Sequence, residues 1–115
     1  MKPAVKKFIL STILALATLS ATSLFWNEPV TATIVLIGLS LLMFSVEPGI
    51  GNMVLYFFGF VFGPIAEAIA IHFGAWNYTL PVIAGIPLWL PFVWGNCGLY
   101  VIRVKAFIST LPSTD

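Results

Sequence analysis

Residues 53–73 read MVLYFFGFVFGPIAEAIAIHF, and this stretch decides the fold. It carries one acidic side chain, Glu67, and no lysine or arginine. An α-helix rises about 1.5 Å per residue, so about 20 apolar residues span the ~30 Å hydrocarbon core of a bilayer. The stretch therefore predicts a helix that crosses a membrane.

The rest of the chain has the same apolar character. Of its 115 residues, 60% are hydrophobic and 8% are charged, whereas about 25% are charged in an ordinary soluble domain. A soluble domain needs a polar surface, which so few charges cannot supply. The composition excludes a soluble globular domain, a disordered tail and a nucleic-acid-binding module. The length fits a single membrane domain, residues 1–115.

Four apolar runs predict an all-α polytopic membrane protein, a bundle of four transmembrane helices. Turn-forming residues such as Asn27-Glu28-Pro29 separate the runs. Lipid offers no hydrogen-bond partners, so each span is expected to be a helix that satisfies its own backbone. The expected spans are about 8–26, 30–46, 53–73 and 82–102.

The basic residues lie near the two ends of the chain, and none lies between Phe8 and Ile102. We interpret them as anchors for lipid headgroups. Four spans put both termini on one side, and the positive-inside rule makes that side the cytoplasmic face of a plasma or inner membrane. The partner implied is the lipid bilayer, with no role for nucleic acid. The basic residues are Lys2, Lys6, Lys7, Arg103 and Lys105.

The first run has a second interpretation as a cleavable signal peptide. Charged Met1–Lys7, apolar Phe8–Leu19 and the small residues Ser20–Ser23 follow one another in the order of such a peptide. If residues 1–23 are removed, three spans remain. The apolar run continues to Trp26, beyond the usual apolar region of a signal peptide, which favours a retained span.

Glu67 is the candidate centre of a site. On the expected helix it lies about 6 Å from the membrane midplane, where a lone carboxylate costs at least ~2.5 kcal/mol. It is either a protonated carboxyl that holds helices together, or a proton carrier, a ligand-binding group or a general acid. Gly59 and Gly63 belong to a stripe of small residues beside it, which we interpret as a packing seam. His72 lies about 140° around the helix, and we interpret it as an interface anchor.

The fourth run carries two prolines. Pro87 and Pro91 would leave the carbonyls of Ile83 and Pro87 without helical donors, so the outer half of the run is expected to face the bundle interior. At the depth of Glu67, this predicts a pocket suited to an apolar, unsaturated or cationic molecule. The candidate ligand-binding residues are Glu67, Trp89, Trp94, Asn96, Trp76 and Tyr78.

Residues 67–94 resemble a segment of integral-membrane carotenoid-biosynthesis proteins of the bisanhydrobacterioruberin hydratase type. The resemblance lies in Glu67, His72-x-Gly74-x-Trp76-x-Tyr78 and Gly85-Ile86-Pro87-x-Trp89-x-Pro91-x-x-Trp94. Those proteins have more spans. The resemblance implies an isoprenoid-like ligand and carries over no catalytic residue.

In size and span number the chain is also similar to small multidrug resistance transporters, four-span dimers with one essential membrane glutamate. Their glutamate lies in the first span, whereas Glu67 lies in the third.

These observations predict a small-molecule-handling or accessory membrane protein with a polar site around Glu67. The alternatives are a membrane enzyme acting on an isoprenoid or carotenoid lipid, a dimeric proton-coupled exporter, and a structural bundle without a ligand. A chain of 115 residues is small for a complete transporter, so a homo-oligomer or a subunit of a membrane complex is expected. With one cysteine, Cys97, and one histidine, no zinc site and no cofactor are expected.

Overall fold

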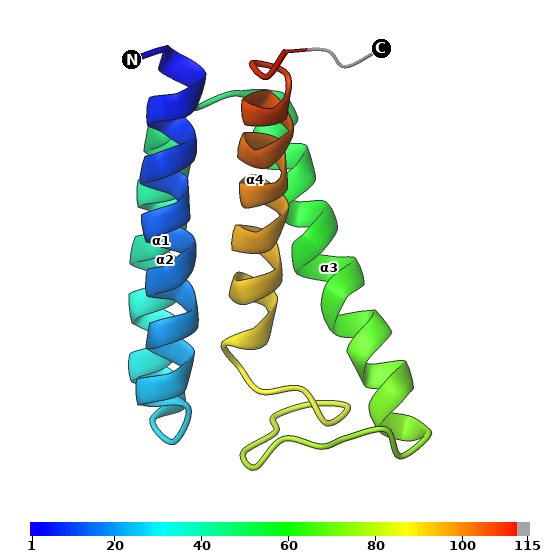
Figure 1. Ribbon diagram of the computed structural model, residues 1–115. Helices are drawn as coiled ribbons and strands as arrows, with labels where there is room; N and C mark the ends of the chain where they lie inside the picture. The colour runs from blue at the N-terminus through cyan, green and yellow to red at the C-terminus, as the bar shows by residue number, and fades with distance from the viewer. Residues whose placement is uncertain (113–115) are drawn as a thin grey trace.

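The computed structural model describes residues 1–112 and has four helices in that range (Figure 1). The helices alternate in direction. The N-terminus, the α2–α3 connection and the last turn of α4 lie at one end of the bundle, which we call the terminal end. The α1–α2 turn and residues 73–89 lie at the other, the loop end. The helices are α1 (Pro3–Phe25), α2 (Pro29–Val46), α3 (Ile50–His72) and α4 (Leu90–Ile108).

The first three apolar runs are confirmed as helices. Pro3 and Pro29 occupy the first turns of α1 and α2, where a missing N–H leaves no hydrogen bond unmade. Each of these three helices is long and apolar enough to cross a membrane. α4 does not meet that criterion, because Asn96, Arg103 and Lys105 reduce its apolar character. Glu67 lies six residues past the middle of α3, about 9 Å along the axis.

The expected helical start of the fourth run at residue 82 is wrong. Ile83 and Ile86 form an antiparallel bridge across a tight turn, in which Ala84 and Gly85 have φ angles of 52° and 80°. Positive φ at both central residues defines a type I′ turn, whose backbone cannot continue into a helix. Residues 82–89 are therefore apolar but not helical, and α4 begins only at Leu90.

The carbonyls that we expected to lack donors have them. The Ile86 N–H donates to the Ile83 carbonyl at 2.8 Å, and the Leu90 N–H donates to the Pro87 carbonyl at 3.2 Å. Pro91 lies in the first turn of α4, where its missing N–H removes no bond. The prolines thus define where α4 begins instead of kinking it.

Apolar side chains cover the outside of the bundle and polar ones lie within it. Leu24, Leu41 and Val54 are each at least 66% exposed. Continuous apolar surface of this kind in a single chain is typical of a surface that contacts lipid. The buried polar or charged residues are Ser11, Thr18, Ser40, Asn96 and Arg103.

Three of these buried polar side chains link all four helices together with the buried Tyr56. Asn96 on α4 donates from Nδ2 to Thr18 Oγ1 on α1 at 3.2 Å, and its Oδ1 accepts from Ser40 on α2 at 2.6 Å. The Ser40 hydroxyl lies 2.9 Å from the Tyr56 hydroxyl on α3. Hydrogen bonds between membrane helices contribute roughly 0.6 kcal/mol on average. This chain of contacts fixes the rotation of each helix about its axis.

α4 stands between the α1–α2 pair and α3, and it contacts all three (Figure 1). The packing seam predicted for α3 is confirmed. A Cβ on Gly59 would lie 2.6 Å from the Trp94 carbonyl oxygen, and one on Gly63 would lie 2.1 Å from the Trp94 ring. Only glycine permits this approach. Toward the loop end α3 diverges from the α1–α2 pair, and residues 73–89 close that end (Figure 1).

An ion-pair cluster lies at the terminal end. Glu47, between α2 and α3, pairs with Lys7 on α1 at 3.2 Å and with Arg103 on α4. The Arg103 side chain is only 10% exposed. Interpreting every basic residue as a headgroup anchor is therefore wrong for Arg103 and incomplete for Lys7, because both form ion pairs within the bundle.

Candidate functional site

The Glu67 carboxyl lies half-buried on the face of α3 that meets α4. It accepts a hydrogen bond from the Tyr78 hydroxyl in the loop and another from the Trp94 indole N–H on α4. Trp94 reaches it because Gly63, one helical turn earlier, leaves room for the indole ring. The packing seam and the carboxyl are thus parts of one local arrangement.

The charge environment of Glu67 is unusual for a carboxyl within an apolar helix. Both of its hydrogen-bond donors are neutral groups. The ion pairs formed within residues 1–112 all involve Glu47, so no lysine or arginine of that range pairs with Glu67. A carboxylate in a poorly solvated place favours an opposite charge or a proton nearby.

Tyr78 responds to this environment. Burial raises the pKa of its phenol above the usual 10.0, and the hydrogen bond to Glu67 and the negative charge of Glu67 raise it further. The phenol therefore stays protonated at neutral pH and acts as a donor to Glu67. Its ring also contacts Trp89 edge-on, with ring centroids 5.9 Å apart.

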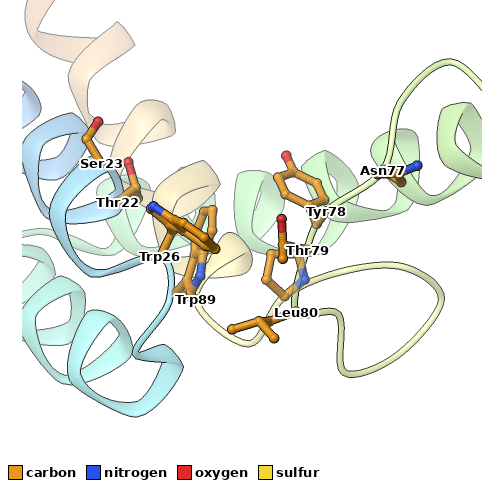
Figure 2. A pocket seen from close by; sticks show the side chains of 9 residues that line it. Thr22, Ser23, Trp26, Asn77, Tyr78, Thr79, Leu80 and Trp89 are labelled. Atoms are coloured by element: carbon orange, nitrogen blue, oxygen red, sulfur yellow. The ribbon is translucent and has the colours of Figure 1, made fainter.

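A pocket of about 280 Å³ with a mixed polar and apolar lining opens at the loop end beside Tyr78. Figure 2 shows Trp26 and Trp89 on one side of it and Tyr78 and Thr79 on the other. Trp89 is 8% exposed, and its indole N–H is buried without a hydrogen-bond partner. Trp89 thus contributes to this pocket and not to the carboxyl site.

Two of the six predicted ligand-binding residues lie away from Glu67. Asn96 is committed to Thr18 and Ser40 in the bundle interior. Trp76 is 47% exposed in the loop. His72 is exposed at the end of α3, with its ring against Phe73. The structure therefore brings Glu67, Tyr78 and Trp94 together, with Trp89 one contact further away.

The sequence interpretation missed the ion-pair partners of Glu47 and the hydrogen-bond partners of Asn96. Glu47 is an acidic residue in the turn at the terminal end, where both basic chain ends also lie, and this shared location was the available signal for its ion pairs. Thr18 and Ser40 gave no signal, because hydroxyl side chains are common in membrane helices and often bond only to their own backbone.

No protein-family model, curated protein or solved structure matches this chain.

Proposed function

We propose that this chain is a four-span integral membrane protein that binds a lipophilic cation beside Glu67. The observation that carries the proposal is the Glu67 carboxyl, which has two neutral donors and no basic partner within residues 1–112. A bound cation would supply the missing opposite charge. The general class is a small-molecule-handling membrane protein.

A lipid-facing crevice between α3 and α4 offers space for such a ligand. It measures about 340 Å³ and is lined by Gly63, Ala66 and Trp94, whose indole N–H donates to Glu67; Glu67 itself does not line it. An indole face attracts cations by about 0.5–2 kcal/mol, and more strongly where water is excluded. Phe58 and Phe62 add aromatic surface to the same crevice. Its walls therefore complement an apolar molecule with a delocalised positive charge.

The proposal includes α4 as the fourth span. Its 19 residues extend about 28 Å, close to the thickness of the hydrocarbon core. The residues that reduce its apolar character, Asn96 and Arg103, are buried against the other helices and need not face lipid. With the basic residues at the terminal end, the positive-inside rule favours both termini in the cytoplasm.

The binding experiment uses tetraphenylphosphonium, a lipophilic cation, and the purified protein in nanodiscs. We expect saturable binding that Glu67→Gln weakens at least about tenfold, or ~1.4 kcal/mol. Glu28→Gln is the matched control, because Glu28 is an exposed acid at the loop end. Equal binding by the native protein and Glu67→Gln would overturn the proposal.

A neutral isoprenoid alcohol, farnesol, distinguishes the remaining functions. Saturable binding of farnesol without binding of tetraphenylphosphonium favours the alternative function, a membrane enzyme that acts on an isoprenoid or carotenoid lipid. Binding of neither favours a structural bundle. Cation binding accompanied by proton-driven uptake into vesicles favours the exporter, which would require a dimer.

Threading through the membrane is tested separately in a Cys97→Ser background. A membrane-impermeant maleimide is expected to label Asn77→Cys in intact cells. Lys2→Cys is expected to react only after the membrane is permeabilised. Labelling of both variants in intact cells would contradict the four-span arrangement.

A further inference from the structure

A pocket lined by two lysines lies between α1 and α2 at the terminal end of the bundle, the upper end in Figure 1. It measures about 360 Å³, and small-molecule sites typically measure about 300–1,000 Å³. It shares no lining residue with the crevice near Glu67 or with the pocket at the loop end. Its lining residues are Pro3, Lys6, Lys7, Leu10, Ser45 and Val46.

The α1 residues of this lining occupy one face of the helix. Pro3, Lys6 and Leu10 are spaced three and four apart, and residues at this spacing lie on the same side of a helix. Lys7, four residues after Pro3, shares that face. The last turn of α2 supplies the opposite wall. The fold therefore brings both lysines to a single hollow between two helices.

Positive charge predominates around the pocket. Within residues 1–112, all five lysine and arginine residues lie near the terminal end, and Glu47 is the one acid there. Glu47 pairs with Lys7 and Arg103, whereas Lys6 is exposed and forms no ion pair in that range. An ammonium group has three N–H donors, so Lys7 keeps two while it contacts Glu47. These charges favour an anion with several acceptor oxygens.

The rest of the lining offers no further side-chain donor. The Ser45 hydroxyl donates to the Leu42 carbonyl of its own helix at 2.6 Å. The other lining residues are apolar, and Leu10 among them is 43% exposed. A charged part beside an apolar part matches a molecule with an anionic head and a hydrocarbon tail.

The depth of the pocket favours a lipid over a soluble anion. Lys7 and Trp26 lie 19 positions apart, which is about 29 Å along α1 and close to the ~30 Å hydrocarbon thickness. Tryptophan is typical of a membrane interface. With Trp26 at one interface, Lys7 lies at the other, at the level of the phospholipid phosphates.

We propose that this pocket, the α1–α2 phosphate site, binds the phosphate of one anionic phospholipid. The phosphate oxygens accept from the ammonium groups of Lys6 and Lys7, and the acyl chains lie against Leu10 and the apolar surface below it. Basic pockets between membrane helices on the cytoplasmic side bind such head groups, and the threading proposed above places this pocket on that side. The inference rests on the proposed spans and is independent of cation binding at Glu67.

The experiment counts the lipids bound to the full-length protein by native mass spectrometry from detergent micelles. We expect phosphatidylglycerol to saturate one site at a lower concentration than phosphatidylcholine, which carries a phosphate but no net charge. Equal binding of the two lipids would overturn the proposal. Inorganic phosphate in large excess is expected to leave the lipid bound. Complete displacement by inorganic phosphate would assign the pocket to a soluble anion and contradict a lipid site.

Lys6→Gln removes one of the two ammonium groups. We expect the half-saturating concentration of phosphatidylglycerol to rise about fivefold, the change that corresponds to ~1 kcal/mol for one basic residue near anionic lipid. Lys6→Arg keeps the charge and is expected to bind like the native protein.

Lys105→Gln is the matched control for this charge. Lys105 is exposed near the same end of the bundle, on α4, and does not line the pocket. We expect its affinity for phosphatidylglycerol to stay within about twofold of the native value. Equal weakening by Lys6→Gln and Lys105→Gln would contradict a specific site and show diffuse attraction by the basic end.

Ser45→Leu tests the space between the helices. Ser45 is exposed, so a larger side chain is tolerated there while it narrows the pocket. The change removes no charge and no free donor, because the Ser45 hydroxyl donates within α2. We expect the preference for phosphatidylglycerol to be lost. Ser20→Leu is the matched control, since Ser20 is also exposed and its hydroxyl donates within α1. Native affinity in Ser45→Leu would contradict binding in this pocket.

Glu67→Gln separates this inference from the proposed function. Phosphatidylglycerol binding is expected to stay within about twofold of the native value, because Glu67 does not line the pocket. Lost binding of tetraphenylphosphonium with retained binding of phosphatidylglycerol supports both sites. Equal binding of the two lipids with tetraphenylphosphonium binding that depends on Glu67 overturns the phosphate site alone. Loss of phosphatidylglycerol binding in Glu67→Gln would contradict the independence of the two sites.

Discussion

Glu67 depends on two donors that lie 11 and 27 positions later in the chain. The sequence identified Glu67 because an acidic residue in an apolar run is costly, and that argument needs no tertiary structure. It could not select between Trp94 and Asn96. These two residues lie about 200° apart on a helix, so only one of them can face α3. The choice depends on how α4 packs against three neighbours at once.

The Tyr78 phenol provides a pH-dependent test at the residue scale. Its pKa is raised in the folded protein, whereas the unfolded chain ionises near the ordinary 10.0. The stabilisation from the neutral phenol is therefore fully present below pH 10.0 and is lost as the pH rises above that value. Ultraviolet absorbance of phenolate, compared between the native protein and Tyr78→Phe, is expected to place this ionisation above its usual range.

Glu67→Gln refines the same measurement. It removes the negative charge beside the phenol, so the Tyr78 pKa is expected to fall. It is not expected to return to 10.0, because burial is the largest cause of the shift. Ionisation of Tyr78 at its ordinary pKa in the native protein would contradict the hydrogen bond to Glu67.

At the scale of helices, the first three elements followed from apolar length alone, and the fourth did not. Hydropathy reports which residues avoid water, whereas helix formation also requires compatible backbone angles. Val82 and Ile83 are apolar and exposed, yet Ala84 and Gly85 turn the chain back on itself. Gly-x-Pro at residues 85–87 contained this information, since the residue before a proline disfavours the helical region.

The contact between α3 and α4 gives a prediction at this scale. Gly63→Ala would place a methyl group against the Trp94 ring, and overpacking of this kind typically costs about 1–3 kcal/mol. The indole would also move away from Glu67. We expect a lower free energy of unfolding in mixed detergent micelles and a changed tryptophan emission.

Gly38→Ala is the matched control. A Cβ at Gly38 would meet nothing within 4 Å, so the change is expected to be neutral or to stabilise α2 by up to about 1 kcal/mol. Equal losses of stability in the two variants would show that the effect is general to helix glycines and not specific to the Trp94 contact.

At the scale of the whole molecule, the terminal end is held by the ion pairs of Glu47. Glu47→Gln would leave Arg103 buried without a charge partner. Glu47 itself is 39% exposed, so the expected loss is about 1–3 kcal/mol, between the values for exposed and buried pairs. Detergent unfolding of Glu47→Gln measures this loss.

Glu28→Gln controls for the removal of a negative charge, because Glu28 is exposed at the opposite end of the bundle. It is expected to unfold like the native protein. Raised salt is expected to narrow the difference between native protein and Glu47→Gln, since Lys7 and Glu47 are both partly exposed. If the difference in unfolding free energy between the native protein and Glu47→Gln does not change with salt, the loss of stability comes from packing and not from the ion pairs.

The network through Asn96 also bears on how the chain assembles. The Thr18 hydroxyl donates to the Leu14 carbonyl one turn earlier in α1, and the Ser40 hydroxyl lies 3.0 Å from the Leu36 carbonyl, to which it can donate before Asn96 is made. Newly made helices can therefore enter lipid with these groups already satisfied. Only α4, synthesised last, brings an amide that reaches both. A nascent chain that stops short of Asn96 therefore has its helices inserted without the side chain that joins α4 to both α1 and α2.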